Sequence, residues 1–502
     1  MEIKMEIQKA AMIGAGSMGG GMTLLFAEHG LSISILDPSE ETVDKLISSG
    51  ECQGIPAGRL SKHTTYKSLC ASLDKEKVFF FSLPHGTVGD DVIRSLKPFL
   101  EKGDIIVDCS NEDWAHTERR QGELVGMGVY YIGMGVSGGY QAARRGPSMS
   151  PGGQDAALDL VLPFLKKVAA KDADGRSCVA KIGQGGAGHY VKMVHNGIEH
   201  AMMSSISEAW AIMEKHLGMS YREIGDEFDR WNASGELKNT FLVKIGADIC
   251  EKKNKKGNYV LADVQDKVVQ DIDGTEGTGI WSNTQAIDLH IPAPTLAVAH
   301  SLRLASADRA QRVHAESVFG KDTFGSATKI KFSDYLEKAA FLDDLRVAVY
   351  INCLTSYIQG MNIISAADIS HKWNISYSSI VQIWRAGCII QADYIASLLE
   401  SIYAEPRKDH NLLYEDKIAA ELKKGFEALK RIVLRTTDAN AVLPSLSASL
   451  EYLKYAANTD LPTAFYEAEM DYFGKHMYDS KSLDHGPGKP ETGKHHFEWK
   501  PA

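Results

Sequence analysis

The chain has 502 residues, of which 44% are hydrophobic and 24% charged, and its formal net charge is −10 at pH 7. The length allows two or three globular domains, and the acidic balance argues against nucleic acid as a partner. Seven scattered cysteines without a CxxC pair suggest neither a disulfide framework nor a metal site, and without a long apolar run or a signal-peptide pattern we expect no membrane partner and a cytoplasmic location.

The first predicted elements form a nucleotide-binding unit. Residues 8–14 predict a strand that runs into a GxGxxG turn, and the residues after the turn predict a helix. Glycines at this spacing permit a tight turn and let a pyrophosphate approach the N-terminus of the helix. The candidate cofactor-binding residues of this turn are Gly14, Gly16, Ser17, Met18 and Gly19.

The next predicted strand, residues 31–36, ends at Asp37. An acidic residue at this position of a dinucleotide-binding fold takes the 2′-hydroxyl of the ribose. A carboxylate repels a 2′-phosphate, and residues 38–41 (PSEE) supply no arginine to offset that repulsion. We therefore predict NAD as the cofactor and keep NADP as the weaker alternative, because a basic residue from elsewhere in the chain could approach Asp37.

Two further strands are predicted at residues 78–83 and 104–107, each before a turn-rich segment. Open α/β sheets bind their ligands at the carboxyl ends of strands, so Leu83 and Asn111 are candidate cofactor contacts. A later strand, residues 130–136, leads into Ser137, Gly138 and Gly139. Adjacent glycines leave backbone N–H groups free to bind a carboxylate, although the same residues also suit a pair of tight turns.

A long amphipathic helix is predicted from Gly183 to His216, because apolar residues recur at steps of three and four. Lys192, Asn196 and Glu199 follow one another at i, i+4 and i+7 and share one face. A cation, an amide and a carboxylate placed in this way can hold a polar substrate and move protons. The alternative is an exposed helix with an ordinary charged face.

Helical periodicity dominates from residue 186 onwards, and the region contains an internal repeat. Residues 216–231 parallel residues 372–387 at an offset that pairs Ser220 with Ser376. We interpret this as two related helical units packed together, of which the second lacks counterparts of Lys192 and Glu199. The last segment, residues 481–502, is polar and rich in glycine and proline, and by itself is typical of a disordered tail.

Several segments together resemble the 6-phosphogluconate dehydrogenase family, and more distantly the β-hydroxyacid dehydrogenases. They are GAGSMG, SNEDWAHTERR, GVSGGYQAARRGPSMSPGG, GAGHYVKMVHNGIEH, GTEGTGIWSNTQAIDLHIPAPTL, WRAGCIIQADYI and EMDYFGKHMYD, and they cover nearly the whole chain. The resemblance implies an α/β Rossmann domain over residues 1–185, a large all-helical domain over 186–480 and an extended tail over 481–502 that reaches into the partner subunit of a homodimer.

The resemblance also implies the chemistry. The family oxidises C3 of a sugar acid, and the resulting β-keto acid loses CO2. By motif match Lys192 is the base and Glu199 the acid that protonates the enediol; lysine can act as a base only if its pKa is lowered by burial or by neighbouring positive charge. The residues that match positions holding the carboxylate and hydroxyls of the substrate are Asn111, Ser137, Gly138, Gly139, His195 and Asn196.

This chain departs from the family where the terminal phosphate of the substrate binds. Thr278, Arg303 and His476 match the family pattern, but His200, Glu276 and Met470 replace its tyrosine, lysine and arginine. A lysine-to-glutamate change in a partly desolvated site costs several kcal/mol at an effective dielectric constant of about 20. We therefore predict oxidative decarboxylation of a non-phosphorylated or otherwise altered aldonate.

Other functions stay open at this point. Cations elsewhere, such as residues 252–256 (KKNKK) or a protonated His200, could replace the missing ones and retain 6-phosphogluconate as the substrate. A β-hydroxyacid dehydrogenase or reductase without decarboxylation, or a non-catalytic paralogue, is also conceivable. The retention of Lys192, Asn196 and Glu199 argues against the last. If the tail crosses the dimer as in the family, His476 belongs to the active site of the neighbouring subunit.

Overall fold

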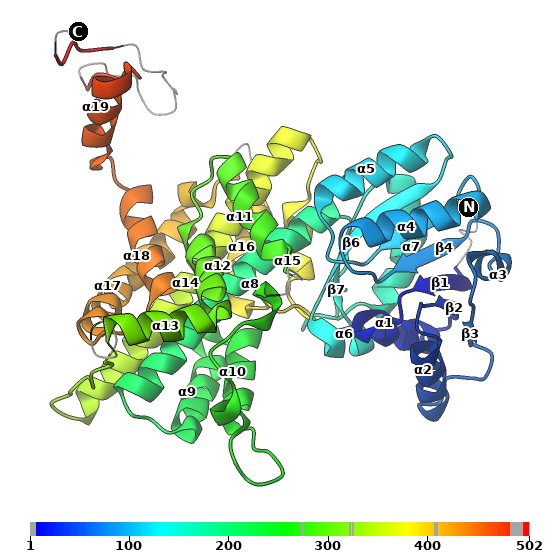
Figure 1. The fold of residues 1–502 in the computed structure, drawn as a ribbon, viewed down its shortest axis with the longest axis horizontal. Helices are drawn as coiled ribbons and strands as arrows, with labels where there is room; N and C mark the ends of the chain where they lie inside the picture. Colours follow the sequence, from blue (N-terminus) through cyan, green and yellow to red (C-terminus); the bar gives the residue numbers. More distant parts are fainter. Residues whose placement is uncertain are drawn as a thin grey trace. The chain divides into compact units, whose positions relative to one another are not determined.

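Strands and helices alternate through the first third of the chain and build one sheet with helices on both faces (Figure 1). The computed structural model describes residues 7–272, 276–320, 323, 326–405, 410–481 and 495–500. Within them the strands are β1 (Lys9–Ile13), β2 (Ser32–Leu36), β3 (Leu60–Lys62), β4 (Val78–Phe81), β5 (Ile105–Asp108), β6 (Tyr130–Ser137) and β7 (Ser148–Gly152). The strands predicted from the sequence therefore exist, with ends that differ by one or two residues.

The described strands lie in the order β3-β2-β1-β4-β5-β6-β7, in which β1 to β6 are parallel and β7 is antiparallel to β6. The helices of this part are α1 (Ser17–Glu28), α2 (Glu40–Cys52), α3 (Tyr66–Ala71), α4 (Thr87–Leu96), α5 (Trp114–Val125), α6 (Gly139–Arg145) and α7 (Asp155–Val168). Parallel pairing aligns Ile13 with Phe81 and Phe81 with Asp108, so the loops after β1, β4 and β5 meet at one edge of the sheet. This is the edge at which doubly wound sheets bind nucleotides.

The sheet has a hydrophobic core on each face. Side chains alternate along β4, so that Val78 and Phe80 pack with α1, α2 and α7, whereas Phe79 and Phe81 pack with α3, α4 and α5. Strands covered on both faces are continuously apolar rather than alternating. The run VFFF is therefore a buried strand, and it places the loop that follows it at the nucleotide-binding edge.

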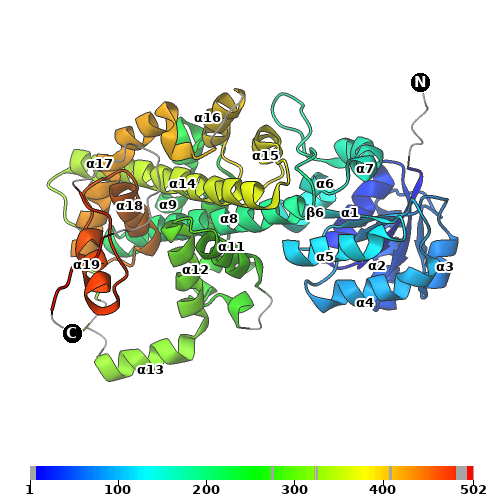
Figure 2. The same ribbon diagram turned by 90° about the horizontal axis from the view of Figure 1, so that it is seen from above.

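The rest of the chain is helical. Its helices are α8 (Ala187–Ala211), α9 (Tyr221–Ala233), α10 (Phe241–Glu251), α11 (Thr278–Asp288), α12 (Pro294–Ala307), α13 (Arg309–Phe319), α14 (Tyr335–His371), α15 (Tyr377–Ile383), α16 (Asp393–Tyr403), α17 (Asp416–Asp438), α18 (Pro444–Ala456) and α19 (Thr463–Gly474). Figure 2 shows α8 beside α14, and the two helices pack against each other. Within the described chain, no helix combines the length and apolarity that crossing a bilayer requires.

Helix α8 differs from the prediction in its start and in its surroundings. It begins at Ala187 rather than Gly183, after Gly185 takes a positive φ of 55°, and a π-helical turn continues it over Ile212–His216. Of its 25 residues, 20 are buried, so it is a central helix and not an exposed amphipathic one. The polar residues Lys192 and Asn196 are thus inside the protein, which removes the alternative of an ordinary solvated face.

The predicted repeat corresponds to two helix starts with the same cap. The Ser220 side chain accepts a hydrogen bond from Glu223 N at the start of α9, and Ser376 accepts one from Ser379 N at the start of α15. Serine at this position satisfies one of the free N–H groups of a first turn. The two predicted units correspond to the α8–α9 and α14–α15 pairs, and their relatedness stays a prediction.

Residues 1–449 and 450–502 form two compact units. In the second, Asp471 on α19 accepts hydrogen bonds from Phe497 N and Trp499 Nε1, both at 3.1 Å or less, and Tyr478 pairs with His495. The described end of the predicted tail, residues 495–500, therefore contacts α19; the tail residues 482–494 lie outside the described residues. The predicted domain boundary at 185/186 falls between α7 and α8.

Candidate active site

The turn between β1 and α1 is built to admit a pyrophosphate. Gly14 has a φ of 97°, and a Cβ added to it would lie 2.1 Å from the carbonyl oxygen of Ser82. Gly16 precedes the first turn of α1 without a side-chain cap, and an added Cβ there would meet nothing within 4 Å. Uncapped N–H groups facing open space fit the phosphates of a dinucleotide.

Asp37 lies beside this turn. Its Oδ2 accepts a hydrogen bond from Ala15 N at 2.7 Å and its Oδ1 accepts one from Ser39 N at 2.8 Å. The carboxylate therefore stands at the carboxyl end of β2, against the glycine turn, where the predicted contact with a ribose hydroxyl would be made.

A cavity of about 1150 Å³ lies in residues 1–449. It brings together thirteen of the predicted site residues from the loops after β1, β4, β5 and β6 and from α8, α11 and α12: Met18, Leu83, Asn111, Ser137, Gly138, Gly139, Lys192, Asn196, Glu199, His200, Glu276, Thr278 and Arg303. The other predicted residues are not among those that line the cavity: Gly14, Gly16, Ser17 and Gly19 belong to the glycine turn and Asp37 follows β2, His195 lies on α8, and Met470 and His476 belong to the unit 450–502.

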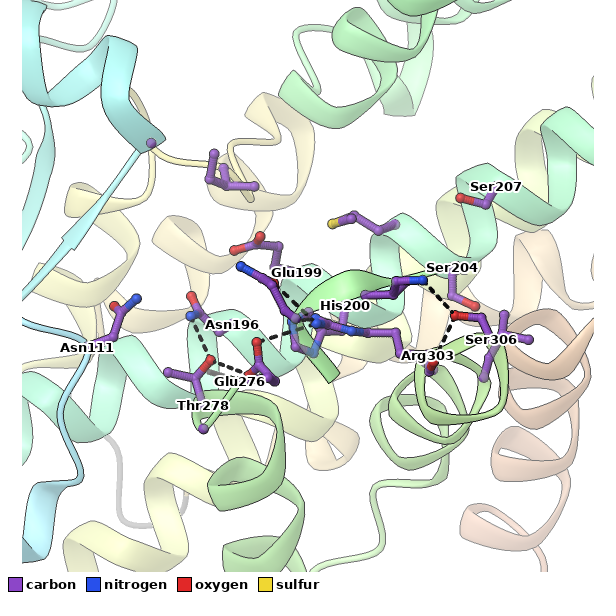
Figure 3. A pocket seen from close by; sticks show the side chains of 18 of the residues that line it. Asn111, Asn196, Glu199, His200, Ser204, Ser207, Glu276, Thr278, Arg303 and Ser306 are labelled. Carbon is purple, nitrogen blue, oxygen red and sulfur yellow. Dashed lines mark hydrogen bonds and ion pairs between the residues drawn. The ribbon is translucent and has the colours of Figure 1, made fainter. Parts of the chain in front are cut away.

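The polar face of α8 forms one wall of this cavity. Lys192 Nζ donates a hydrogen bond to Asn196 Oδ1 at 2.7 Å, and Asn196 Nδ2 donates one to Thr278 Oγ1 at 2.9 Å (Figure 3). Glu199 is one turn further along, with Oε2 3.7 Å from His195 Nδ1. The helical spacing predicted from the sequence thus points the amine, the amide and the carboxylate to the same space.

Burial shifts the pKa values of these groups in opposite directions. Desolvation lowers the pKa of Lys192, although the charges of Glu199, Cys388 and Glu276 oppose that shift. Desolvation raises the pKa of Glu199, while Lys192 opposes the shift and Glu276 adds to it. An amine that loses its proton more easily and a carboxyl that keeps its proton longer suit a base and an acid near neutral pH.

His195 connects this helix to the predicted carboxylate-binding loop. Its Nδ1 is 2.9 Å from Asn196 Oδ1, and its Nε2 is 2.9 Å from Ser137 Oγ and 3.1 Å from Cys388 Sγ. Burial holds the pKa of His195 well below its usual range, and the charge of Lys192 lowers it further. The neutral ring therefore donates from Nδ1 to the amide and accepts at Nε2, which orients the Ser137 hydroxyl.

The loop that carries Cys388 and Ile389 was not singled out from the sequence. Ile389 N donates a hydrogen bond to Ser137 Oγ at 3.2 Å, and a Cβ added to Gly138 would lie 2.3 Å from the carbonyl oxygen of Gly387. Gly138 is thus needed because the backbone of another segment packs directly on it. The segment WRAGCIIQADYI was recognised as a family stretch, but no local pattern places it beside Ser137.

Glu112 and Arg120 are two further residues that sequence reasoning missed. Arg120 Nη1 donates to Glu112 Oε2 at 2.8 Å, and Gly86 N donates to Glu112 Oε2 at 3.1 Å. These bonds tie the loop after β4 to the loop after β5, which carry Leu83 and Asn111. Both residues lie in the stretch SNEDWAHTERR, Glu112 before α5 and Arg120 within it. The sequence marks this stretch but does not show which residues these two contact.

Beyond Glu199, Arg303 lies among acidic groups in the cavity, which Lys267 and Arg312 also line. Arg303 Nε donates to Asp271 Oδ2 at 3.1 Å, and its Nη2 donates to Glu276 Oε2 at 3.4 Å. Arg303 Nη1 donates to Nε2 of His200, whose pKa burial and the charge of Arg303 hold below its usual range. Two carboxylates and a neutral imidazole therefore surround this guanidinium, and Asp271 was not foreseen.

Comparisons with known proteins agree with this arrangement. The model of the NAD binding domain of 6-phosphogluconate dehydrogenase matches residues 9–183, and that of the C-terminal domain of 6-phosphogluconate dehydrogenase matches residues 188–499. A protein of Emericella nidulans named 6-phosphogluconate dehydrogenase, decarboxylating, is 42% identical over 501 residues, covering 97% of this chain and all of its own length. A Salmonella typhimurium protein of the same name is 36% identical and covers 99% of this chain and all of its own length.

Among solved structures, 6-phosphogluconate dehydrogenase of Plasmodium falciparum, described in apo form, with NADP+ and with 6-phosphogluconate, is similar. Its TM-score is 0.87 at 31% identity, and the match covers 98% of this chain and all of that chain. The family models, the relatives and the structure cover the same nearly complete length, from the glycine turn to the helical domain. This chain belongs to the 6-phosphogluconate dehydrogenase family.

Proposed function

We propose that this protein oxidises and decarboxylates a sugar acid, with Lys192 as the base and Glu199 as the acid. The observation that carries the proposal is the pair itself: both groups project from one face of the buried helix α8 into the cavity, and burial shifts their pKa values in opposite directions. The names of the relatives, which include the word decarboxylating, support the same reaction class.

The residues divide the reaction between them. A bound nicotinamide dinucleotide supplies the hydride acceptor for C3 of the substrate. Neutral Lys192 takes the proton of the C3 hydroxyl as the ketone forms, and the protonated amine then polarises that carbonyl while the bond to the carboxylate breaks and CO2 leaves. The electron pair of the broken bond forms a C=C bond while Lys192 returns its proton to the former carbonyl oxygen, which gives an enediol. Glu199 then protonates the enediol carbon as Lys192 takes the proton of that hydroxyl again and the ketone re-forms. Asn196 and the neutral His195 hold Lys192 and Ser137 in place throughout.

We further propose that the far end of the substrate carries no phosphate. A phosphate dianion requires several cationic donors, because charge-assisted hydrogen bonds are the strong ones. Of the cations that line the cavity, Arg303 is already paired with Asp271 and Glu276 and Arg312 with Asp266, and His200 is uncharged. A polyhydroxylated, non-phosphorylated aldonate suits this balance of charge.

NAD is the proposed cofactor. The side chain of Asp37 stands beside the glycine turn and accepts hydrogen bonds from two backbone N–H groups, which hold it at the position proposed for the ribose hydroxyl. A 2′-phosphate at that position would meet this negative charge directly.

A homodimer is proposed as the working form, with His476 and Met470 contributed by the neighbouring subunit. In residues 450–502, apolar side chains are exposed to an extent unusual for a free surface: Phe465 is 72% exposed and Phe473 is 73% exposed. Apolar groups gathered in this way mark a protein–protein contact. The predicted cytoplasmic location is part of the same proposal.

A panel of phosphorylated and unphosphorylated aldonates, assayed with NAD and with NADP, tests these statements together. We expect reduced cofactor and CO2 in equal amounts, higher kcat/KM for gluconate than for 6-phosphogluconate, and higher kcat/KM with NAD than with NADP. Reduced cofactor without CO2 would instead identify a non-decarboxylating β-hydroxyacid dehydrogenase.

A second candidate is 6-phosphogluconate dehydrogenase itself, which the names of the relatives and the retained Thr278 and Arg303 favour. Saturation by 6-phosphogluconate at concentrations well below those of gluconate would establish this activity and reject the neutral substrate.

A further inference from the structure

Glu276 occupies an unusual place for a residue that lines a substrate cavity. It stands two positions before the first residue of α11, and its side chain turns back onto that helix. Glu276 Oε1 accepts a hydrogen bond from Gly279 N at 2.6 Å and another from Thr278 Oγ1 at 2.9 Å (Figure 3). The carboxylate thus takes the free N–H and hydroxyl groups of the first turn, where an anion is favoured.

The other donors around this carboxylate complete an anion-binding set. Arg303 Nη2 approaches Glu276 Oε2 at 3.4 Å, and the side chain of Glu276 is only 10% exposed. His200 is 6% exposed, and among the described residues its Nδ1 has no hydrogen-bond partner. This Nδ1 lies 2.8 Å from the position of a Cβ added to Gly279, so it points at the same first turn. Since Nε2 of His200 accepts from Arg303, Nδ1 carries the proton and is a spare donor.

Glu276 is ionised in this environment. Desolvation raises the pKa of its carboxyl, but the hydrogen bond from Gly279 N and the neighbouring charges and donors outweigh that effect and lower the pKa below its ordinary value. The site therefore already contains a negative charge at neutral pH. An external dianion would meet both this charge and a set of donors that are in use.

We propose that Glu276 is a built-in anion, which fills with a carboxylate of the chain the subsite where a terminal phosphate of the substrate would otherwise bind. The inference rests on the proposed function, and it goes further, because it explains the choice of substrate by occupation of specific donors and not by net charge alone. It predicts that the donors regain an external anion when the carboxylate is removed.

The same carboxylate is linked to the catalytic helix. Thr278 Oγ1 donates to Glu276 and accepts from Asn196 Nδ2. The other side-chain atom of this amide, Asn196 Oδ1, accepts from Lys192 Nζ. With Thr278 oriented in this way, its hydroxyl lone pairs are available to Asn196, and its proton is spent on Glu276. The substrate hydroxyl nearest Thr278 must therefore act as a donor or bind elsewhere, which again suits a polyol end rather than a phosphate.

Thermal unfolding with inorganic phosphate tests the proposal without any turnover. The variants are Glu276→Ala, which frees the donors, and Glu276→Gln, which removes the charge but keeps the shape. The matched control is Asp248→Asn, since Asp248 is 60% exposed on α10, pairs with Lys244 and is not among the residues that line the cavity. Phosphate should raise the melting temperature of Glu276→Ala, raise that of Glu276→Gln less because the amide oxygen keeps the Gly279 and Thr278 donors occupied, and leave the wild type and Asp248→Asn within error of their phosphate-free values.

Kinetics provide the second readout. The ratio of kcat/KM for 6-phosphogluconate to kcat/KM for gluconate should rise by about tenfold or more in Glu276→Ala and by less than about twofold in Asp248→Asn. Equal ratios, or equal phosphate effects on melting in folded Glu276 variants and in the control, would overturn the proposal. A wild type that releases no CO2 from any aldonate would reject the proposed function instead, and the phosphate effect on melting would still decide whether Glu276 fills an anion subsite.

Discussion

At the scale of single residues, the chemistry depends on two buried groups of opposite charge on one helix. Lys192 is 8% exposed and donates to Asn196, while Glu199 lies one turn further along and lines the same cavity. The charge of each group favours the charged form of the other, whereas burial disfavours the charged form of both. The titrations of Lys192 and Glu199 are therefore coupled. The pH dependence of turnover is then a property of the pair.

The pair predicts a bell-shaped profile of kcat against pH. Activity should rise with pH as Lys192, with its pKa lowered from 10.5, loses its proton, and should fall as Glu199, with its pKa raised from 4.5, loses the proton that it must donate. Glu199→Gln should lower kcat by about 100-fold or more and remove the fall at high pH. Lys215→Ala, a change of a lysine elsewhere on the cavity wall, is the control and should keep both limbs. A Glu199→Gln profile that keeps its alkaline limb would contradict the assignment of the acid.

At the scale of elements, the position of Lys192 depends on how closely α8 approaches β6. A Cβ added to Gly135 on β6 would lie 2.2 Å from the Cβ of Lys192 and 2.6 Å from Ser150 Oγ. A Cβ added to Gly188 on α8 would lie 2.1 Å from the carbonyl oxygen of Gly133. The helix therefore lies directly on the backbone of the strand, and this packing fixes the position of the Lys192 amine.

Gly135→Ala tests this contact. Overpacking should cost about 1–3 kcal/mol of unfolding free energy, and the forced displacement of Lys192 should lower kcat by about 100-fold. Urea unfolding and steady-state kinetics measure the two effects. Gly122→Ala on α5 is the matched control, since an added Cβ there meets nothing within 4 Å, and it should stabilise the protein by about 0.5–1 kcal/mol with kcat unchanged. Wild-type kcat in Gly135→Ala would show that α8 is positioned by other contacts.

At the scale of the whole molecule, the proposed dimer predicts complementation between two inactive variants. Lys192→Ala lacks the base, and His476→Ala lacks the group that the neighbouring subunit is proposed to supply. In a mixed dimer, one site carries both defects and the other carries neither. Randomly reassembled subunits should therefore show about one quarter of wild-type activity.

The measurement compares the separate variants with a mixture unfolded and refolded together, or with the two chains co-expressed. Lys192→Ala mixed with Lys215→Ala serves as the control, since it contains wild-type His476 on every subunit. Activity of the mixture no greater than the mean of the separate variants would place His476 in its own subunit's site or outside any site.

The sequence by itself determined those features that depend on local periodicity. Five of the described parallel strands (β1, β2, β4, β5 and β6) were predictable from apolar runs, whereas β3 has only three residues and no such run and was not predicted. The GxGxxG turn was predictable because its backbone requires glycine at specific positions. The face shared by Lys192, Asn196 and Glu199 followed from helical spacing alone. The internal repeat paired Ser220 with Ser376, but that both cap a helix came from the structure.

Only the tertiary structure decided what surrounds those residues. Cys388 reaches Ser137 across 251 positions of the chain, and Asp271 pairs with Arg303, but no short-range pattern records either contact. Burial of α8 was likewise invisible, since its apolar and polar residues have the spacing of a surface helix. From the sequence, Glu276 was interpreted as a negative charge in place of a lysine of the family. The structure shows that its carboxylate accepts hydrogen bonds from the first turn of α11. Periodicity specifies which side of an element faces inward, but the partners and the dielectric that set its chemistry are specified by packing between distant segments.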